Sequence, residues 1–434
     1  MTSPQYNKKQ IIHSLSFASN SGFGVIFEDT VTCQRSYEQL QAFVSEVSNK
    51  VLSDASTQKY IGTDWKTVWG PVVYSHDQNS SFARADNTMG VYYSPSEKLF
   101  VIAIAGTNAI SSFGWMKEDF HVNETAVWNH ISGKGMGDIS QGTATGLDVL
   151  INKMKDQGVD VLTALKNYIT TNNITEAEVA VTGHSLGGAL SPALALYLSD
   201  KRTEWNNGQK IQISTYPSAG PTIGVYPNKK KDLEKNNFIK YYNDEIDNGN
   251  IIYESTINNL DIVPLAWDKD DIAKIPTLYK SEKIKDDSIG MMALMAVFNT
   301  FKKATFKQYS YKHIKTETVS GTFDDDIEAL IIMVLRGFKA GGPLANSYIP
   351  KALQTYIVNL ENVVRFFVQA AYQHTKAYDK LLGIEAFTKS FYSVKNKVKE
   401  NQPSRLTAPS NSDEEVITLA SRTAGINLMA LPKT

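Results

Sequence analysis

One serine in this chain stands where the residue pattern changes abruptly. Residues 178–182 form a short β-branched run, and the motif GHSLGG at residues 183–188 separates it from an apolar helical stretch that reaches residue 198. A serine hydroxyl is a weak nucleophile, and a tight strand-to-helix turn exposes it to a base on one side and to a substrate on the other. The glycines leave room for the backbones that such a turn brings together. The pattern predicts a nucleophile elbow with Ser185 as the nucleophile, and a helix cap is the alternative.

A serine nucleophile needs a base and a carboxylate that orients the base. In α/β hydrolases both partners follow the serine in the chain. Asp261 opens the segment DIVP after a strand-like run at residues 250–255, and a capped turn before proline is the alternative role for this aspartate. Of the seven histidines, only His313 and His374 follow Asp261. Either histidine fits by chain order, because geometry and not order makes a base.

The chemistry also needs donors for the negative charge of a tetrahedral intermediate. One expected donor is the amide of Leu186, directly after the nucleophile. The other is expected in the turn AGTN at residues 105–108, which follows the apolar run LFVIAIA at residues 99–105. That run is apolar enough to be a central strand buried on both faces. Thr107 is therefore the second candidate, through its amide and its hydroxyl, and a plain polar turn is the alternative.

The elements that must position these residues alternate between strands and helices. Strand-like runs occur at residues 67–74, 89–93, 99–105, 179–182, 211–216 and 250–255, and helical patterns at residues 30–52, 142–170 and 189–198. This alternation predicts an α/β fold with a mostly parallel central sheet flanked by helices. Apolar helical stretches prevail at about residues 273–369 and predict a helical insertion. We expect a helical lead at residues 1–60, a main domain at 61–400 that contains the insertion, and a tail at 401–434.

Composition excludes several classes of protein. Lys and Arg number 44 against 45 Asp and Glu, so no overall charge attracts nucleic acid. The single cysteine, Cys33, excludes an intrachain disulfide and a cysteine-based zinc site. The N-terminal residues lack the apolar core of a secretory signal, and no apolar run reaches the length of a membrane span. We expect a cytosolic protein, or one exported without a classical signal peptide, with no transmembrane segment and no nucleic-acid partner.

In their order along the chain, several segments resemble the class 3 lipases, a family that includes fungal triacylglycerol lipases and plant phospholipase A1 enzymes. The matching segments are the strand and Gly-Thr turn at 101–108, the elbow at 183–188, TYPSAGPTIG at 215–224, DIVP at 261–264 and YKHIKTE at 311–317. Two features depart from the family pattern. Ala105 stands where the family usually has arginine before the Gly-Thr turn, and the span from Asp261 to His374 is longer than usual.

The resemblance implies the site residues and their roles. In this family the histidine of the YKHIKTE-like segment is not the base, and the base belongs to a later His-x-x-x-Tyr segment, which His374 to Tyr378 fits. The implied triad is therefore Ser185, Asp261 and His374. The implied fold is the α/β-hydrolase fold, and the implied activity is cleavage of lipid acyl esters through an acyl-enzyme on Ser185, without a cofactor or a metal.

The resemblance also implies a lid that opens at a lipid surface, at residues 108–116. Its apolar members are Ile110, Phe113, Trp115 and Met116, which are favourable against acyl chains. Packing on the core is the alternative for these side chains. The expected partners are a lipid ester substrate and, by peripheral contact, a lipid surface. A catalytically silent lipase-fold scaffold that binds proteins is the rival function, and a membrane-perturbing helical insertion is a third.

Overall fold

The computed structural model describes residues 4–28, 33–76, 82–108, 121–122, 124–130, 135–227, 237–279, 309–322, 327, 330, 357–402, 406–407 and 409–429. Within them, an eight-stranded sheet has the order β14-β12-β9-β8-β5-β4-β2, with β11 paired to β9. Its strands are β2 (Lys66–Tyr74), β4 (Asn87–Ser94), β5 (Leu99–Ile104), β8 (Glu176–His184), β9 (Lys210–Ser218), β11 (Ile251–Tyr253), β12 (Thr256–Asn258) and β14 (Glu317–Val319). Strands β5, β8, β9, β11, β12 and β14 pair with one another in parallel. At one edge, β4 pairs antiparallel with β5, and β2 pairs antiparallel with β4. This is the mostly parallel sheet that the sequence predicts.

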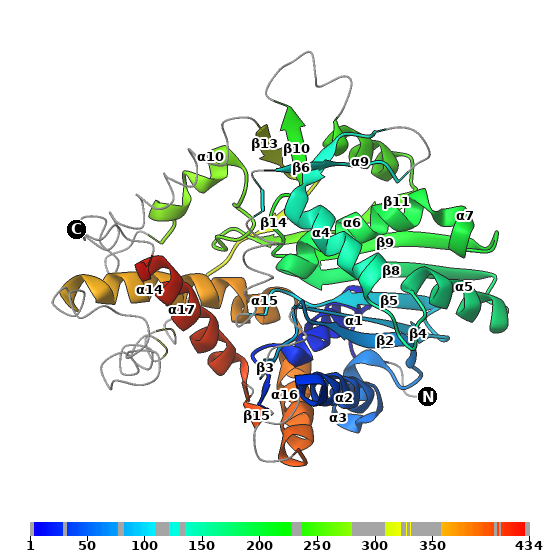
Figure 1. Ribbon diagram of the computed structural model, residues 1–434, viewed down its shortest axis with the longest axis horizontal. Coiled ribbons are helices and arrows are strands. Elements are labelled where there is room, and N and C mark those ends of the chain that lie inside the picture. Colours follow the sequence, from blue (N-terminus) through cyan, green and yellow to red (C-terminus); the bar gives the residue numbers. More distant parts are fainter. Residues whose placement is uncertain are drawn as a thin grey trace.

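Helices cover both faces of this sheet (Figure 1). They are α1 (Lys8–Ser19), α2 (Cys33–Ser53), α3 (Ala55–Ile61), α4 (Gln141–Asp148), α5 (Val161–Thr171), α6 (Leu186–Asp200), α7 (Arg202–Trp205), α9 (Phe238–Asp247), α10 (Lys269–Ile272), α14 (Ile357–His374), α15 (Lys376–Leu381), α16 (Glu385–Glu400) and α17 (Ser412–Met429). In Figure 1, α2, α3 and α16 gather on one side of the sheet, and α14 and α17 lie side by side beyond its end. The fold is that of an α/β hydrolase.

Strand β5 shows why the sheet is buried on both faces. All six of its residues are buried. Leu99, Val101 and Ala103 face a core cluster that includes residues of α1, α2 and α16. The alternate residues Phe100, Ile102 and Ile104 face a second cluster with residues of α5 and α6. Because side chains alternate across a strand, a continuous apolar run needs apolar cover on each face.

Two smaller sheets flank the central one. The order β13-β10-β7-β6 joins Tyr309–Lys312, Gly224–Pro227, Asp138–Ser140 and Thr125–Val127, and the order β15-β1-β3 joins Leu406–Thr407, Ile26–Glu28 and Phe82–Ala83. Strands β13 and β14 fall within residues 273–369, where the sequence predicts a helical insertion. The described part of that region also contains a 3₁₀ turn, Ile275–Thr277, and α14. Residues 280–308 and 331–356, which hold most of its apolar stretches, lie outside the described residues.

The predicted helical pattern at residues 142–170 is interrupted. Helix α4 continues into a π-helical turn at Val149–Lys153, and α5 begins only at Val161. Gly158 lies in the connection with a φ of +83°, a conformation that glycine adopts without strain. None of the described helices is both long enough and apolar enough to cross a lipid bilayer.

Candidate active site

Ser185 stands at the sharp bend between β8 and α6. Its φ of 59° and ψ of −121° place a non-glycine residue in a strained backbone conformation. The bend is held by the Ser185 N–H, which donates to the carbonyl oxygen of Ser218 on β9 at 3.0 Å. A Cβ at Gly183 would lie 2.3 Å from the backbone of Gly187, and one at Gly187 would lie 2.3 Å from the carbonyl oxygen of Ile104. The elbow therefore requires glycine at both positions.

A chain of hydrogen bonds joins the serine to a histidine and an aspartate. His374, the last residue of α14, places Nε2 2.8 Å from Ser185 Oγ. Its Nδ1 lies 2.9 and 3.1 Å from the two carboxylate oxygens of Asp261. A carboxylate only accepts hydrogen bonds, so the neutral imidazole carries its proton on Nδ1 and presents the Nε2 lone pair to the serine hydroxyl. The structure thus brings together the three residues of the expected triad.

Asp261 is fully buried, and three donors face its carboxylate. Besides His374, the Val263 N–H donates to Oδ1 at 3.0 Å and the Tyr378 hydroxyl donates to Oδ2 at 3.0 Å. The Tyr378 oxygen in turn accepts the Asn258 N–H at 2.9 Å. Because a buried carboxylate is stabilised only when its oxygens are hydrogen-bonded, these donors hold Asp261 in the orientation that meets the imidazole.

The rival histidine lies elsewhere. His313 follows β13 and lines a separate small cavity with Pro192 and Ile257. Burial is the main cause that lowers the pKa of its imidazole below the ordinary value. The structure therefore places His374, and not His313, beside Ser185.

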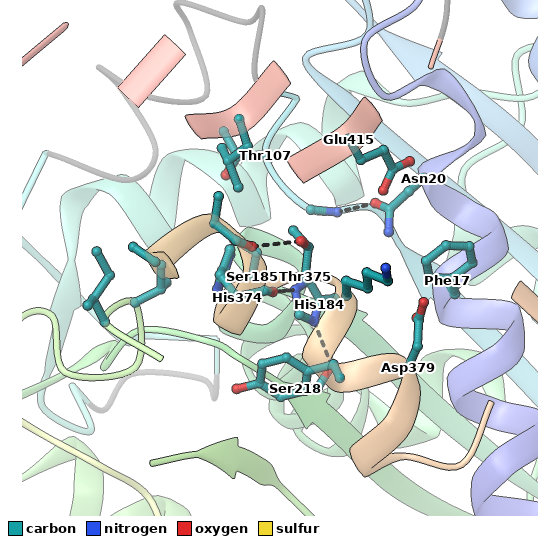
Figure 2. A pocket seen from close by; sticks show the side chains of 18 of the residues that line it. Phe17, Asn20, Thr107, His184, Ser185, Ser218, His374, Thr375, Asp379 and Glu415 are labelled. Carbon is teal, nitrogen blue, oxygen red and sulfur yellow. Dashed lines mark hydrogen bonds between the residues drawn. The ribbon is translucent and has the colours of Figure 1, made fainter. Parts of the chain in front are cut away.

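A cavity of about 250 Å³ opens at Ser185 and His374. Most of its lining is apolar, from residues after β12, from α10, from α14 and from α1: Phe17, Ile262, Val263, Ala266, Trp267, Ile272, Ile275, Phe367, Ala370 and Ala371. Polar side chains gather on one side, where Figure 2 shows Asn20, Asp379 and Glu415. Burial raises the pKa of Asp379 to about 8, so this carboxyl group is mostly protonated at neutral pH. The cavity thus joins an apolar wall to a polar wall at the serine.

The two residues predicted to supply amide donors lie in the elements next to the serine. Leu186 is the first residue of α6, and Thr107 lines the same cavity as Ser185 (Figure 2). The turn of Thr107 packs tightly against the elbow, since a Cβ at Gly106 would lie 2.9 Å from the His184 carbonyl oxygen. The predicted lid residues Ile110, Phe113, Trp115 and Met116 lie outside the described residues. Among the described residues, no group of His, Cys, Asp or Glu side chains is arranged to hold a metal ion.

Two site residues make hydrogen bonds that sequence reasoning did not identify. His184 donates from Nε2 to the main-chain carbonyl oxygen of His374 at 2.6 Å. Asn20, at the end of α1, accepts the Gly106 N–H at 2.9 Å. The first could be suspected from the motif, where a histidine precedes the serine. The second has no local signal, because its partner is 86 residues away.

Comparisons with known proteins found similarity to lipases. Residues 101–267 match the model of the lipase (class 3) family. The crystal structure of M37 lipase is 26% identical, with a TM-score of 0.60, over 91% of this chain and 100% of that chain. The Rhizomucor miehei lipase propeptide complex is 18% identical, with a TM-score of 0.36, over 59% of this chain and 62% of that one. Lipase II from Rhizopus niveus is 20% identical, with a TM-score of 0.36, over 57% and 79%. No curated protein sequence matches the chain significantly.

Proposed function

We propose that this chain, whose residues 101–267 match the class 3 lipase family, hydrolyses acyl esters of lipids through an acyl-enzyme on Ser185. The family supports a carboxylic ester hydrolase as the general class. The finer proposal covers the triad, the covalent intermediate and a substrate of triacylglycerol or phospholipid type. The single observation that carries it is the Ser185–His374–Asp261 hydrogen-bond chain, whose serine and histidine line a mostly apolar cavity.

In the proposed reaction, His374 Nε2 takes the proton of the Ser185 hydroxyl as Oγ attacks the ester carbonyl carbon. The carbonyl π electrons move to oxygen and form a tetrahedral oxyanion. Collapse of this intermediate breaks the bond to the alcohol, which leaves with the proton held on Nε2. Water then attacks the acyl-enzyme by the same steps, gives its proton through His374, and releases the fatty acid and the free serine.

Each neighbour of the serine has a part in this scheme. Asp261 keeps the His374 proton on Nδ1 and stabilises the imidazolium that forms during attack. The amides of Leu186 and Thr107 are the proposed donors to the oxyanion, and loss of one such donor costs about 10² to 10³ in rate. The apolar wall with Phe367 and Trp267 is suited to an acyl chain, because burying methylenes there removes them from water.

A fluorophosphonate probe tests the proposal directly. Such a probe phosphonylates a serine only where a base activates it, so wild type should be labelled and Ser185→Ala should not. Thin-layer analysis of products from triacylglycerol emulsions and from phosphatidylcholine vesicles would then identify the ester that is cut. Unlabelled, folded wild-type protein would favour the rival function, a silent scaffold that binds protein partners. No described contact favours that rival at present.

A further inference from the structure

Two asparagine side chains hold the turn that carries Thr107 through hydrogen bonds. The carboxamide oxygen of Asn20 accepts the Gly106 N–H at 2.9 Å. On the other side of Thr107, the Asn108 carboxamide oxygen accepts the Gly24 N–H at 3.0 Å. The two asparagines thus tie both neighbours of Thr107 to the short segment that follows α1, which lies outside the part of the chain matched by the family model.

The amide group of Asn108 completes the second contact. Its Nδ2 donates to the carbonyl oxygens of Gly22 and Ala85 at 3.3 and 3.0 Å. Asn108 is only 3% exposed, so these bonds are shielded from water. A buried side-chain amide with both its oxygen and its nitrogen paired fixes the backbone that bears it.

The segment that supplies Asn20 is itself rigidly seated. Helix α1 buries Ile11, Ile12 and Leu15 in the core cluster that also holds Val101 of β5. Asn20 closes this helix, and its own N–H donates to carbonyl oxygens of the last turn. The Asn20 side chain, labelled in Figure 2, therefore projects from a fixed point of the scaffold toward the turn.

We infer that Asn20 is a positioning residue of the oxyanion loop, so that the N-terminal helix takes part in catalysis. The inference rests on the proposed function. Amide donors stabilise an oxyanion only if they are already aligned with the place where charge develops. A misplacement of about 1 Å can lower the rate strongly. The turn at Gly106 packs against the elbow, since a Cβ added at Gly106 would lie 3.3 Å from Ser185 Cβ. The position of this turn therefore sets the distance from Thr107 to the reacting carbon.

The test compares Asn20→Ala with a matched control, Asn206→Ala. Asn206 also accepts a glycine N–H on its carboxamide oxygen, from Gly208 at 3.1 Å, but in the turn before β9 and outside the cavity lining. On p-nitrophenyl butyrate we expect Asn20→Ala to lower kcat by about tenfold, less than loss of a whole donor. KM and the pH profile should stay at wild-type values, because the acyl wall and His374 are untouched. Asn206→Ala should keep wild-type kcat.

Equal kcat in the two variants, or a change confined to KM, would overturn the inference. A second readout is hydrogen exchange of the peptide that contains Gly106, which should become faster in Asn20→Ala and not in Asn206→Ala. If wild type hydrolysed no ester, the proposed function would fail, yet exchange at Gly106 would still decide whether Asn20 holds the turn. Unchanged exchange would overturn the positioning role whatever the activity.

Discussion

The imidazole of His184 donates from Nε2 to the main-chain carbonyl oxygen of His374, 2.6 Å away. Its Nδ1 lies 3.1 Å from the Ser218 hydroxyl, which is the donor in that bond. Burial, the largest cause, lowers the pKa of His184 well below the ordinary value, so the ring stays neutral and keeps this tautomer. His184, which precedes the nucleophile in the sequence, therefore holds the backbone of His374, whose side chain faces the nucleophile.

We expect His184→Leu to lower kcat by about tenfold, because the end of α14 loses the donor that fixes the His374 backbone. His184→Gln should restore most of the activity, since a glutamine amide reaches about as far as Nε2. Initial rates on p-nitrophenyl butyrate, with thermal unfolding of each variant as a check on folding, measure both effects. Equal losses in the two variants would show that packing, and not the hydrogen bond, matters at this position.

The two histidines that the sequence leaves as candidate bases should respond very differently to substitution. His374→Ala removes the group 2.8 Å from Ser185 Oγ and should lower kcat by about 10⁴ to 10⁶. His313→Ala should leave kcat within a few-fold of wild type, because His313 lines a separate cavity. Steady-state kinetics on purified, folded variants would decide. If His313→Ala abolished kcat and His374→Ala left it unchanged, the assignment of the base would be reversed.

Tyr378 should matter through Asp261. In Tyr378→Phe the carboxylate loses a donor at 3.0 Å and the buried Asn258 N–H loses its acceptor, so we expect about a tenfold lower kcat and a lower melting temperature. The matched control is Tyr241→Phe. It removes a hydroxyl that donates to Asp200 at a distance of 2.5 Å, and neither residue lines the cavity. That control should lose stability alone. A full loss of kcat in the control would mean that the assay reports folding.

Local patterns were sufficient where the feature is local. The run LFVIAIA predicts a strand buried on both faces, and β5 is such a strand. The elbow needs only the adjacent residues 183–188, so its glycines and serine can be recognised without any knowledge of the rest of the fold. The choice of His374 over His313 did not follow from the residues alone and depended on the family resemblance.

Contacts between distant segments were beyond such reasoning. Ala105 stands where the resemblance to class 3 lipases implies an arginine, and nothing near it in the sequence indicates what holds the turn. The structure places Asn20 there, 86 residues earlier than Gly106. Likewise, β13 and β14 are short strands in a region of mainly apolar helical pattern, and pairing with β10 and β12 makes them strands. In β13 and β14, long-range pairing overrides a weak local preference for helix.

His13 on α1 gives a prediction for stability against pH. It is 2% exposed, and neither ring nitrogen has a hydrogen-bond partner within the described residues. Burial lowers the pKa of His13 to about 3, whereas the unfolded chain should keep about 6.5. Between these values the unfolded state binds the extra proton, so this contribution to stability is complete above pH 6.5 and is lost as the pH falls toward 3.

Replacement of His13 by leucine should therefore stabilise the protein most at acidic pH. The free energy of unfolding of His13→Leu relative to wild type should rise by at most about 1.4 kcal/mol per pH unit as the pH falls below 6.5, which is the slope for one proton. Urea unfolding of both proteins at pH 7.5, 6.0 and 5.0 gives that difference, and carboxylates common to both cancel from it. A difference that stays constant over this range would mean that His13 finds a proton or a water molecule in the folded state.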